Sequence, residues 1–217
     1  MEKIIHQIWV GKYKMPKREK SFVELMKQKN STWEHMLWTD LEVLQLNMPP
    51  NIKNAYNYFL KDDDYVAQAD ILRLFLVYEF GGIYLDVDFE TRKGFDELNL
   101  LSYDGFICYH DTDIRVDTIP NGIFGSKKGN KLFEFLNKNI SSNYHTPYVV
   151  GKFIKQYYNL NLEKTEHLGE NGLLNYFKRD NIFYMPFNDF HNNYYFHHAL
   201  YSHSPEMKRK FKEGKIE

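Results

Sequence analysis

Two aspartates one residue apart, Asp86 and Asp88, have the types and spacing that most directly suggest chemistry. They end an apolar run in GGIYLDVDFE, residues 81–90. Carboxylates at positions i and i+2 of an extended strand point to the same side. Two buried anions repel one another unless a cation offsets the repulsion. Hard divalent cations prefer oxygen ligands, so the pair predicts a metal site that holds a diphosphate. Two solvated aspartates in a turn are the alternative.

A second polar pair precedes this run in the sequence. Asp70 and Arg73 are three residues apart in a predicted helix over 62–82, which is otherwise largely apolar. Side chains at this spacing lie on one face of a helix. The pair either forms a salt bridge within the helix or projects into the cleft beside the aspartates, where it would bind a polyhydroxylated ligand.

The elements that must position these residues alternate along the chain. Such alternation favours an α/β fold with a doubly wound sheet, in which ligands bind at the carboxyl ends of strands. We expect a single domain over residues 1–217, with a tail over 191–217. Strands are predicted over 3–11, 33–40, 82–88, 103–111, 122–127 and 181–190, and helices over 19–29, 51–60, 62–82, 130–140 and 148–158.

Composition narrows the classes of protein. The 217 residues are 43% hydrophobic and 17% aromatic, as in globular domains, and the net charge of −1 gives no support for a nucleic-acid binder. A single cysteine, Cys108, allows no disulfide framework within the chain and fits a reducing compartment. The first twenty residues are too charged for a signal peptide, and charges and glycines interrupt the most apolar run, 71–85. We expect a cytoplasmic protein, bacterial or viral, without a transmembrane segment and with at most peripheral membrane contact.

Two stretches carry a resemblance to a known family. KIIHQIWVG (3–11) and ADILRLFLVYEFGGIYLDVD (69–88) resemble the DxD sugar transferases of glycosyltransferase family 32. That family includes yeast-type α-mannosyltransferases, capsular polysaccharide transferases and, more distantly, the glucosylating clostridial toxins. The likeness is looser at 120–133 and 194–203. It implies a GT-A fold with a mixed sheet. It also implies transfer of a sugar from a UDP- or GDP-sugar to a glycan or protein-linked acceptor, usually with retention of configuration.

The resemblance also implies roles for residues on the donor side. Asp70, Arg73 and Asp86 would form the catalytic set, with Asp70 and Arg73 on the donor sugar. Asp86 would bind ribose or sugar hydroxyls, and the metal directly or through water. The remaining donor contacts implied are Trp9 with Ile8 on the nucleobase, Tyr84 near the nucleotide, and Asn121 toward the sugar or the acceptor.

The implied metal is Mn²⁺ or Mg²⁺, held by Asp88, Asp86 and a histidine of the tail. His197 falls where the family has its C-terminal histidine, and neutral imidazole suits Mn²⁺. His198 and His203 are alternatives. The tail aromatics over 194–196 would hold the histidine in place, and a chain ending at residue 191 is expected to fold without turning over substrate.

Two other functions compete with a transferase. A metal-dependent hydrolase of phosphate or sugar esters would use the same aspartates, but no second cluster of metal ligands precedes them in the sequence. A non-catalytic domain that binds nucleotide-sugars would keep the fold and lose turnover. The presence of Asp70, Arg73, Asp86 and Asp88 together favours the transferase.

Overall fold

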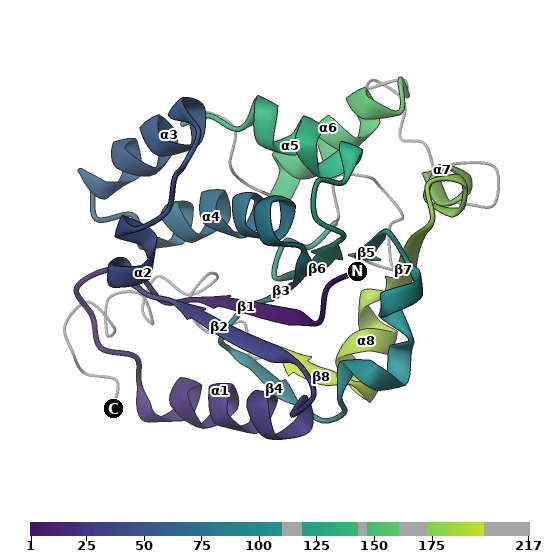
Figure 1. Cartoon of the computed structure of the whole chain (residues 1–217), viewed down its shortest axis with the longest axis horizontal. Coiled ribbons are helices and arrows are strands. Elements are labelled where there is room, and N and C mark those ends of the chain that lie inside the picture. The colour runs from purple at the N-terminus through teal and green to yellow at the C-terminus, as the bar shows by residue number, and fades with distance from the viewer. Residues whose placement is uncertain (110–118, 143–146, 161–172, 198–217) are drawn as a thin grey trace.

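The structure is a computed structural model, which describes residues 1–109, 119–142, 147–160 and 173–197. A six-stranded sheet carries helices on both faces, and a two-stranded sheet accompanies it (Figure 1). The strands are β1 (Ile4–Ile8), β2 (Glu34–Trp38), β3 (Gly82–Leu85), β4 (Phe89–Thr91), β5 (Gly105–Tyr109), β6 (Ile123–Ser126), β7 (Ile182–Pro186) and β8 (Tyr195–His197). The helices are α1 (Lys17–Lys29), α2 (Asp40–Leu44), α3 (Pro50–Leu60), α4 (Tyr65–Phe80), α5 (Lys131–Asn139), α6 (Pro147–Tyr157), α7 (Leu173–Arg179) and α8 (Phe187–Asn193), with 3₁₀ turns at Phe95–Leu98 and Leu100–Ser102.

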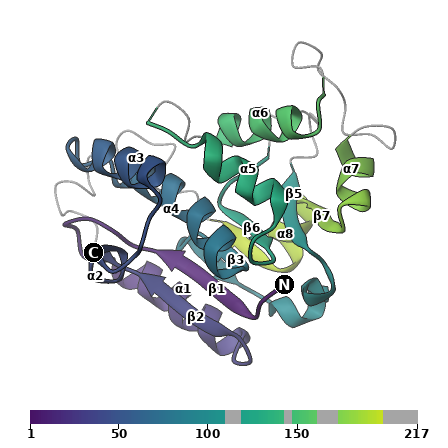
Figure 2. The ribbon, with the colours of Figure 1, turned by 45° about the horizontal axis from the view of Figure 1, so that its top comes forward.

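The large sheet is mixed, with strand order β2-β1-β3-β6-β5-β7. Strand β1 pairs in parallel with β2 on one side and β3 on the other, whereas β6 runs antiparallel to both β3 and β5 (Figure 2). Because the next two strands of the chain, β2 and β3, lie on opposite sides of β1, the carboxyl ends of β1 and β3 form a switch point, where open α/β sheets bind ligands. The expected mixed sheet flanked by helices is confirmed.

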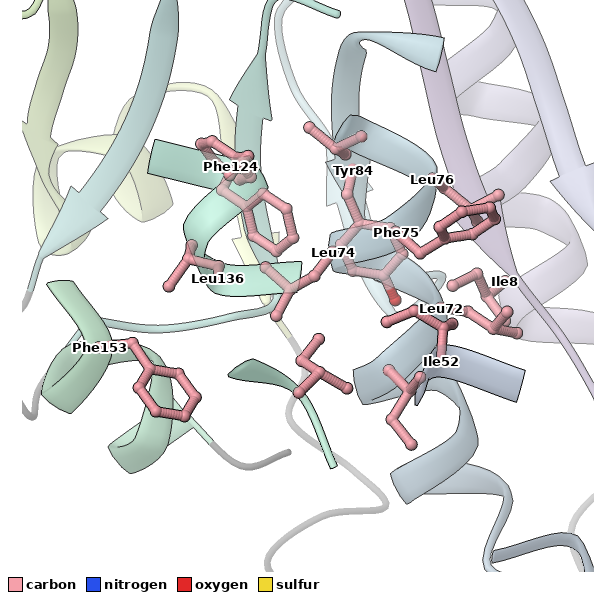
Figure 3. Close-up of a cluster of buried hydrophobic side chains, with 14 of the residues drawn as sticks. Ile8, Ile52, Leu72, Leu74, Phe75, Leu76, Tyr84, Phe124, Leu136 and Phe153 are labelled. Atoms are coloured by element: carbon pink, nitrogen blue, oxygen red, sulfur yellow. The ribbon is translucent and has the colours of Figure 1, made fainter. Parts of the chain in front are cut away.

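Apolar side chains cover both faces of the sheet. On one face, α3, α4, α5 and α6 bury a cluster that includes Ile8, Tyr84 and Phe124, as Figure 3 shows. On the other, Ile83 and Leu85 join a second cluster with residues of α1 and β8. Alternate residues of β3 therefore point into two separate cores. No helix among the described residues is both long and apolar enough to cross a bilayer.

A glycine turn joins α4 to β3 and sets the position of the helix that carries Asp70 and Arg73. Gly81 and Gly82 have φ values of 73° and 90°, a region that side chains strain. A methyl group on Gly82 would lie 2.4 Å from the carbonyl oxygen of Ile4. Nε2 of His6 lies 2.8 Å from the carbonyl oxygen of Gly81, and Trp38 donates its indole N–H to Nδ1 of His6 at 3.0 Å. The turn is thus held against β1.

The predicted strand over 82–88 is too long. Strand β3 ends at Leu85, and the chain turns through Asp86–Asp88 before β4 begins at Phe89. Leu85 pairs with Ile123, the first residue of β6, so beyond it the partner strand is absent. The two carboxylates therefore belong to a turn at the open end of the sheet and do not share one face of an extended strand.

The predicted strand over 181–190 is also wrong in its second half. Strand β7 ends at Pro186, where α8 begins directly. Proline has no N–H for continued pairing and its fixed φ suits the start of a helix. The sequence prediction also missed β4, α7 and the antiparallel pairing of β4 with β8. Strands β4 and β8 are each only three residues long, which is too short for a periodic pattern of apolar residues to be recognised.

Candidate active site

The turn with the two aspartates is anchored by its main chain. Asp86 donates its N–H to the carbonyl oxygen of Gly122 at 2.9 Å, and its own carbonyl oxygen accepts the N–H of Phe89 at 3.3 Å. The Asp86 side chain is a quarter exposed, and Asp88 is 9% exposed. The carboxylate of Asp86 is therefore accessible to a ligand at the carboxyl end of β3, whereas Asp88 is mostly buried.

The guanidinium of Arg73 links the residues predicted to bind the donor. Its side chain is only 6% exposed. Nη2 lies 3.1 Å from Oδ1 of Asp70 and 3.4 Å from Oδ1 of Asp86, while Nη1 donates to the carbonyl oxygen of Asn121 at 2.7 Å. The guanidinium carbon also lies 4.7 Å from the centre of the Tyr84 ring. The salt bridge within α4 is thus present, and Arg73 also reaches from α4 to the turn.

The hydroxyl group of Tyr84 donates to Oδ1 of Asp86. The ring is 1% exposed, so this side chain reaches a nucleotide only through Asp86. Burial, with the neighbouring charge of Asp86, raises the pKa of Tyr84 well above its usual value. The hydroxyl therefore stays protonated at neutral pH and acts as a donor.

Burial and neighbouring charges shift the pKa values of Asp70 and Arg73. Burial raises the pKa of Asp70 to about 6, with Arg73 opposing and Asp86 reinforcing the rise. Burial disfavours the charged form of Arg73, but Asp86 and the other acidic groups outweigh it and hold its pKa above the usual value; Asp88 also contributes. Among the described residues, the carboxyl groups of Asp70, Asp86 and Asp88 thus all act on the one guanidinium of Arg73.

The turn before β6 supplies contacts that sequence reasoning saw only in part. Asn121 was expected to face the sugar or the acceptor, and its side chain donates to Oδ1 of Asp70 at 2.8 Å. Gly122 was missed: a methyl group there would lie 2.8 Å from Oδ2 of Asp86 and 3.3 Å from the Phe89 ring. Gln7 was also missed, and its amide lies 3.5 Å from the carbonyl oxygen of Asp86. The Asn121-Gly122 pair is typical of a turn in the sequence, but the sequence does not indicate that this turn contacts Asp70 and Asp86.

At the end of β1, Ile8 and Trp9 take different places. The Ile8 side chain is 5% exposed and belongs to the core beneath α4 (Figure 3). It is therefore not available to stack on a nucleobase. Trp9 is partly exposed, and its indole N–H donates to the carbonyl oxygen of Tyr13 at 2.8 Å. This leaves Trp9 as the aromatic surface at the switch point.

The predicted histidine ligands lie at the edge of the described chain. The main chain of His197 pairs with Phe89, the residue after Asp88. Strand β8 thus brings the tail beside the aspartate turn, although nothing is described of the His197 side chain. His198 and His203 lie outside the described residues.

The residues of the turn fit a hard divalent cation. Asp86 and Asp88 offer carboxylate oxygens from one turn, and both carboxylates act on the charge of Arg73. Mg²⁺ and similar ions are often held by one or two carboxylates together with substrate phosphates. No group of three or more His, Cys, Asp or Glu side chains able to hold a metal occurs among the described residues. A cation here would take its remaining ligands from substrate, water or the tail.

Comparison with known proteins identifies the family that the chain resembles. Residues 16–107 match the family described as the glycosyltransferase sugar-binding region containing a DXD motif. Inositol phosphoceramide mannosyltransferase 3 of Schizosaccharomyces pombe is 30% identical over 158 residues, which cover 68% of this chain and 40% of that protein. An uncharacterised glycosyltransferase of Acanthamoeba polyphaga mimivirus is 28% identical over 141 residues, covering 63% of this chain and 54% of its own. The chain thus spans about half the length of these relatives.

A solved structure shows the same fold. The PaToxG glycosyltransferase superimposes with a TM-score of 0.60 at 18% sequence identity, covering 72% of this chain and 69% of that one. The likeness supports the expected GT-A type of α/β fold. The family match contains Asp70, Arg73, Tyr84 and both aspartates of the turn. Through this sugar-binding region the chain belongs to the DXD-motif glycosyltransferases.

Proposed function

We propose that this protein transfers a sugar from a nucleoside-diphosphate sugar to a hydroxyl group of an acceptor, with the help of a divalent cation. The observation that carries the proposal is the single network in which Arg73 joins Asp70 of the same helix to Asp86 of the turn. The network lies at the switch point of the sheet, where a sugar nucleotide would bind. UDP- and GDP-sugars are the donors to test.

Each group in the network has a chemical task. Asp70 would accept hydrogen bonds from hydroxyls of the donor sugar. Arg73 would hold the carboxylates of Asp70 and Asp86 in fixed positions relative to each other through its two ion pairs. Trp9 would stack on the nucleobase, and Asn121 would fix the orientation of Asp70 through the hydrogen bond that its side chain donates to Oδ1. Carboxylates near the ring can stabilise the positive charge that develops on the sugar as its bond to phosphate breaks.

Asp88 and Asp86 would hold Mn²⁺ or Mg²⁺, which stabilises the negative charge of the departing diphosphate as a Lewis acid. A histidine of the tail, His197 or His198, would complete this site. Retention of configuration, with attack on the same face as the leaving group, follows family analogy and is part of the proposal. So is a single domain over residues 1–217 whose tail closes the site.

The acceptor and the setting are proposed more broadly. A glycan or glycoprotein hydroxyl is our first choice, with a role in making surface polysaccharide, in the cytoplasm of a bacterium or of a host cell. Inositol phosphoceramide belongs in the acceptor panel because a similar protein is named for it.

A donor panel tests the proposal. UDP- and GDP-sugars are added with Mn²⁺, Mg²⁺ or EDTA, and both thermal stabilisation and release of nucleoside diphosphate are measured. We expect one donor to stabilise the protein only with a cation, and release to rise when the right acceptor is present. Full activity in EDTA would refute the proposed requirement for a divalent cation.

Variants of Asp88 separate the transferase from its rivals. Asp88→Asn removes the charge that a cation needs and should lower turnover more than Asp88→Glu, with a difference of at least about tenfold. A hydrolase would release sugar or phosphate without elongating any acceptor. A binding domain would be stabilised by the donor and release nothing.

A further inference from the structure

Gln7 is a polar residue in an apolar place. It lies on β1 and is fully buried. Its neighbours on the chain and the adjacent strand, Ile5 and Leu85, belong to the core on the face of the sheet opposite α4. A buried amide destabilises the fold unless its polar atoms are hydrogen-bonded. The contacts of Gln7 therefore indicate what it is for.

Both ends of the Gln7 amide have partners. Nε2 lies 3.5 Å from the carbonyl oxygen of Asp86, and Oε1 lies 3.0 Å from Nε2 of His35. A carbonyl oxygen only accepts, so the amide nitrogen must face Asp86 and the amide oxygen must accept the N–H of His35. The amide thus has one orientation.

The sheet register explains why His35 reaches Gln7. Ile5 is opposite His35 and Gln7 is opposite Leu37, so Gln7 and His35 are diagonal neighbours on one face. Burial, the largest effect, together with Lys27 lowers the pKa of His35 to about 4. At neutral pH the ring is therefore uncharged, and its Nε2–H can donate to Gln7.

The Gln7 contact completes the anchoring of Asp86. Gly122, in the turn before β6, accepts the N–H of Asp86, and Tyr84 and Arg73 approach the Asp86 carboxylate from the α4 side. Gln7 reaches the Asp86 carbonyl oxygen from β1, on the other side of β3. At 3.5 Å the contact is longer than an ordinary N–H···O hydrogen bond and is therefore weaker than the bond from Asp86 to Gly122.

We propose that Gln7, oriented by His35, is a positioning residue that confines the Asp86–Asp88 turn to the geometry in which it binds cation and diphosphate. The ligand in this statement rests on the proposed function. The confinement of the turn does not, and it can be measured without substrate.

Hydrogen exchange tests the confinement. Gln7→Met keeps the length of the side chain but removes both hydrogen-bonding ends. We expect the amides of Asp86–Phe89 to exchange about tenfold or more faster than in the wild type, because the Asp86 carbonyl oxygen loses the Gln7 contact and the turn is then held there by the N–H of Phe89. Ile5→Val is the matched control, since it loosens the same core face two residues earlier without touching the turn. Unchanged exchange at the turn in Gln7→Met, or equal acceleration in Ile5→Val, overturns the proposal.

Binding measurements test the consequence. In Gln7→Met the Mn²⁺ concentration for half-maximal binding of nucleoside diphosphate should rise about 10- to 100-fold, the usual effect of losing a residue that orients a metal ligand. His35→Leu should also raise this Mn²⁺ concentration. His35→Gln, which keeps an N–H for Gln7, should stay within about threefold of the wild type.

The two proposals fail in different ways. If the wild-type protein binds no nucleotide or cation, the proposed function fails, and the exchange measurement still decides whether Gln7 confines the turn. If the wild type binds both and Gln7→Met binds Mn²⁺ within twofold of it, the positioning role is refuted while the proposed function stands.

Discussion

At the scale of single residues, the site depends on contacts that restrict the conformation of Asp86. Its N–H, its carbonyl oxygen and its carboxylate are each held by a different neighbour, among them Gly122, Gln7 and Tyr84. A carboxylate held in this way loses little conformational entropy when it binds a ligand. Small changes in these neighbours should therefore alter ligand binding more than folding.

Gly122→Ala is the sharpest such change. The added methyl group would lie 2.8 Å from Oδ2 of Asp86, which must shift the carboxylate. We expect Mn²⁺-dependent binding of nucleoside diphosphate to weaken about tenfold or more. Calorimetric titration measures it. Gly105→Ala serves as control, because a methyl group there lies no closer than 3.3 Å to its nearest neighbours, Ile182 and the carbonyl oxygen of Gly125. Equal binding in both variants would contradict the prediction.

Asp70→Asn tests recognition of the donor sugar. The amide keeps the shape of the side chain but not the charge that faces Arg73. We expect the affinity for the nucleotide-sugar to fall about tenfold, in line with the loss of a charged hydrogen bond. Affinity for the free nucleoside diphosphate should change little. An equal fall for both ligands would show that Asp70 only supports the fold.

At the scale of elements, strand β8 joins the tail to the body beside the aspartate turn. Tyr195 is fully buried; its ring stacks on Phe190 at 5.0 Å and on Phe95 at 4.9 Å between centroids, and its hydroxyl lies 3.4 Å from Asn30. The expectation that a chain ending at residue 191 folds normally is therefore not supported, because that chain would leave a cavity in the core.

Tyr195→Ala measures this anchoring. We expect the free energy of unfolding to fall by about 3–5 kcal/mol, as for other large aromatic residues removed from a core. Tyr195→Phe, which loses only the hydroxyl, should lose about 1 kcal/mol. Urea unfolding followed by fluorescence measures both. Tyr194→Ala is the control, since that side chain is partly exposed; a loss as large as that of Tyr195→Ala would contradict the role assigned to Tyr195.

At the scale of the whole molecule, two histidines of neighbouring strands make the fold sensitive to acid. Burial lowers the pKa of His6 to about 4, although the carbonyl of Gly81 opposes the effect. His35 shifts in the same direction. The folded chain keeps both rings neutral, whereas the unfolded chain protonates them near pH 6.5. Their contribution to stability is complete above that pH.

Stability should therefore fall as the pH drops from about 6.5 to about 4, where His6 alone contributes a loss of roughly 3 kcal/mol. Protonation of Nδ1 would also break the bond from Trp38. Urea unfolding at pH 7 and pH 4.5 measures the loss, and NMR of the His6 ring measures its pKa. A ring that titrates near 6.5 in the folded protein would contradict the prediction.

Local sequence determined much of this protein. The apolar run before the aspartates, the helix with Asp70 and Arg73, and the glycine pair between them were all readable, because periodicity and turn residues act over a few neighbours. So were β1, β2, β5 and β6, although their predicted bounds differ from the observed ones by one to three residues at each end. The family resemblance indicated the function of the region.

Only the tertiary structure decided which distant segments meet. Asn121 and Gly122 reach Asp70 and Asp86 because β6 runs antiparallel to β3, and the tail reaches the turn because β8 pairs with β4. Strand order and register follow from how the two cores pack on both faces of the sheet, which no local pattern encodes. For the same reason Gln7, the middle residue of the apolar stretch 3–11, becomes a contact of the aspartate turn only when β1 and β3 lie side by side.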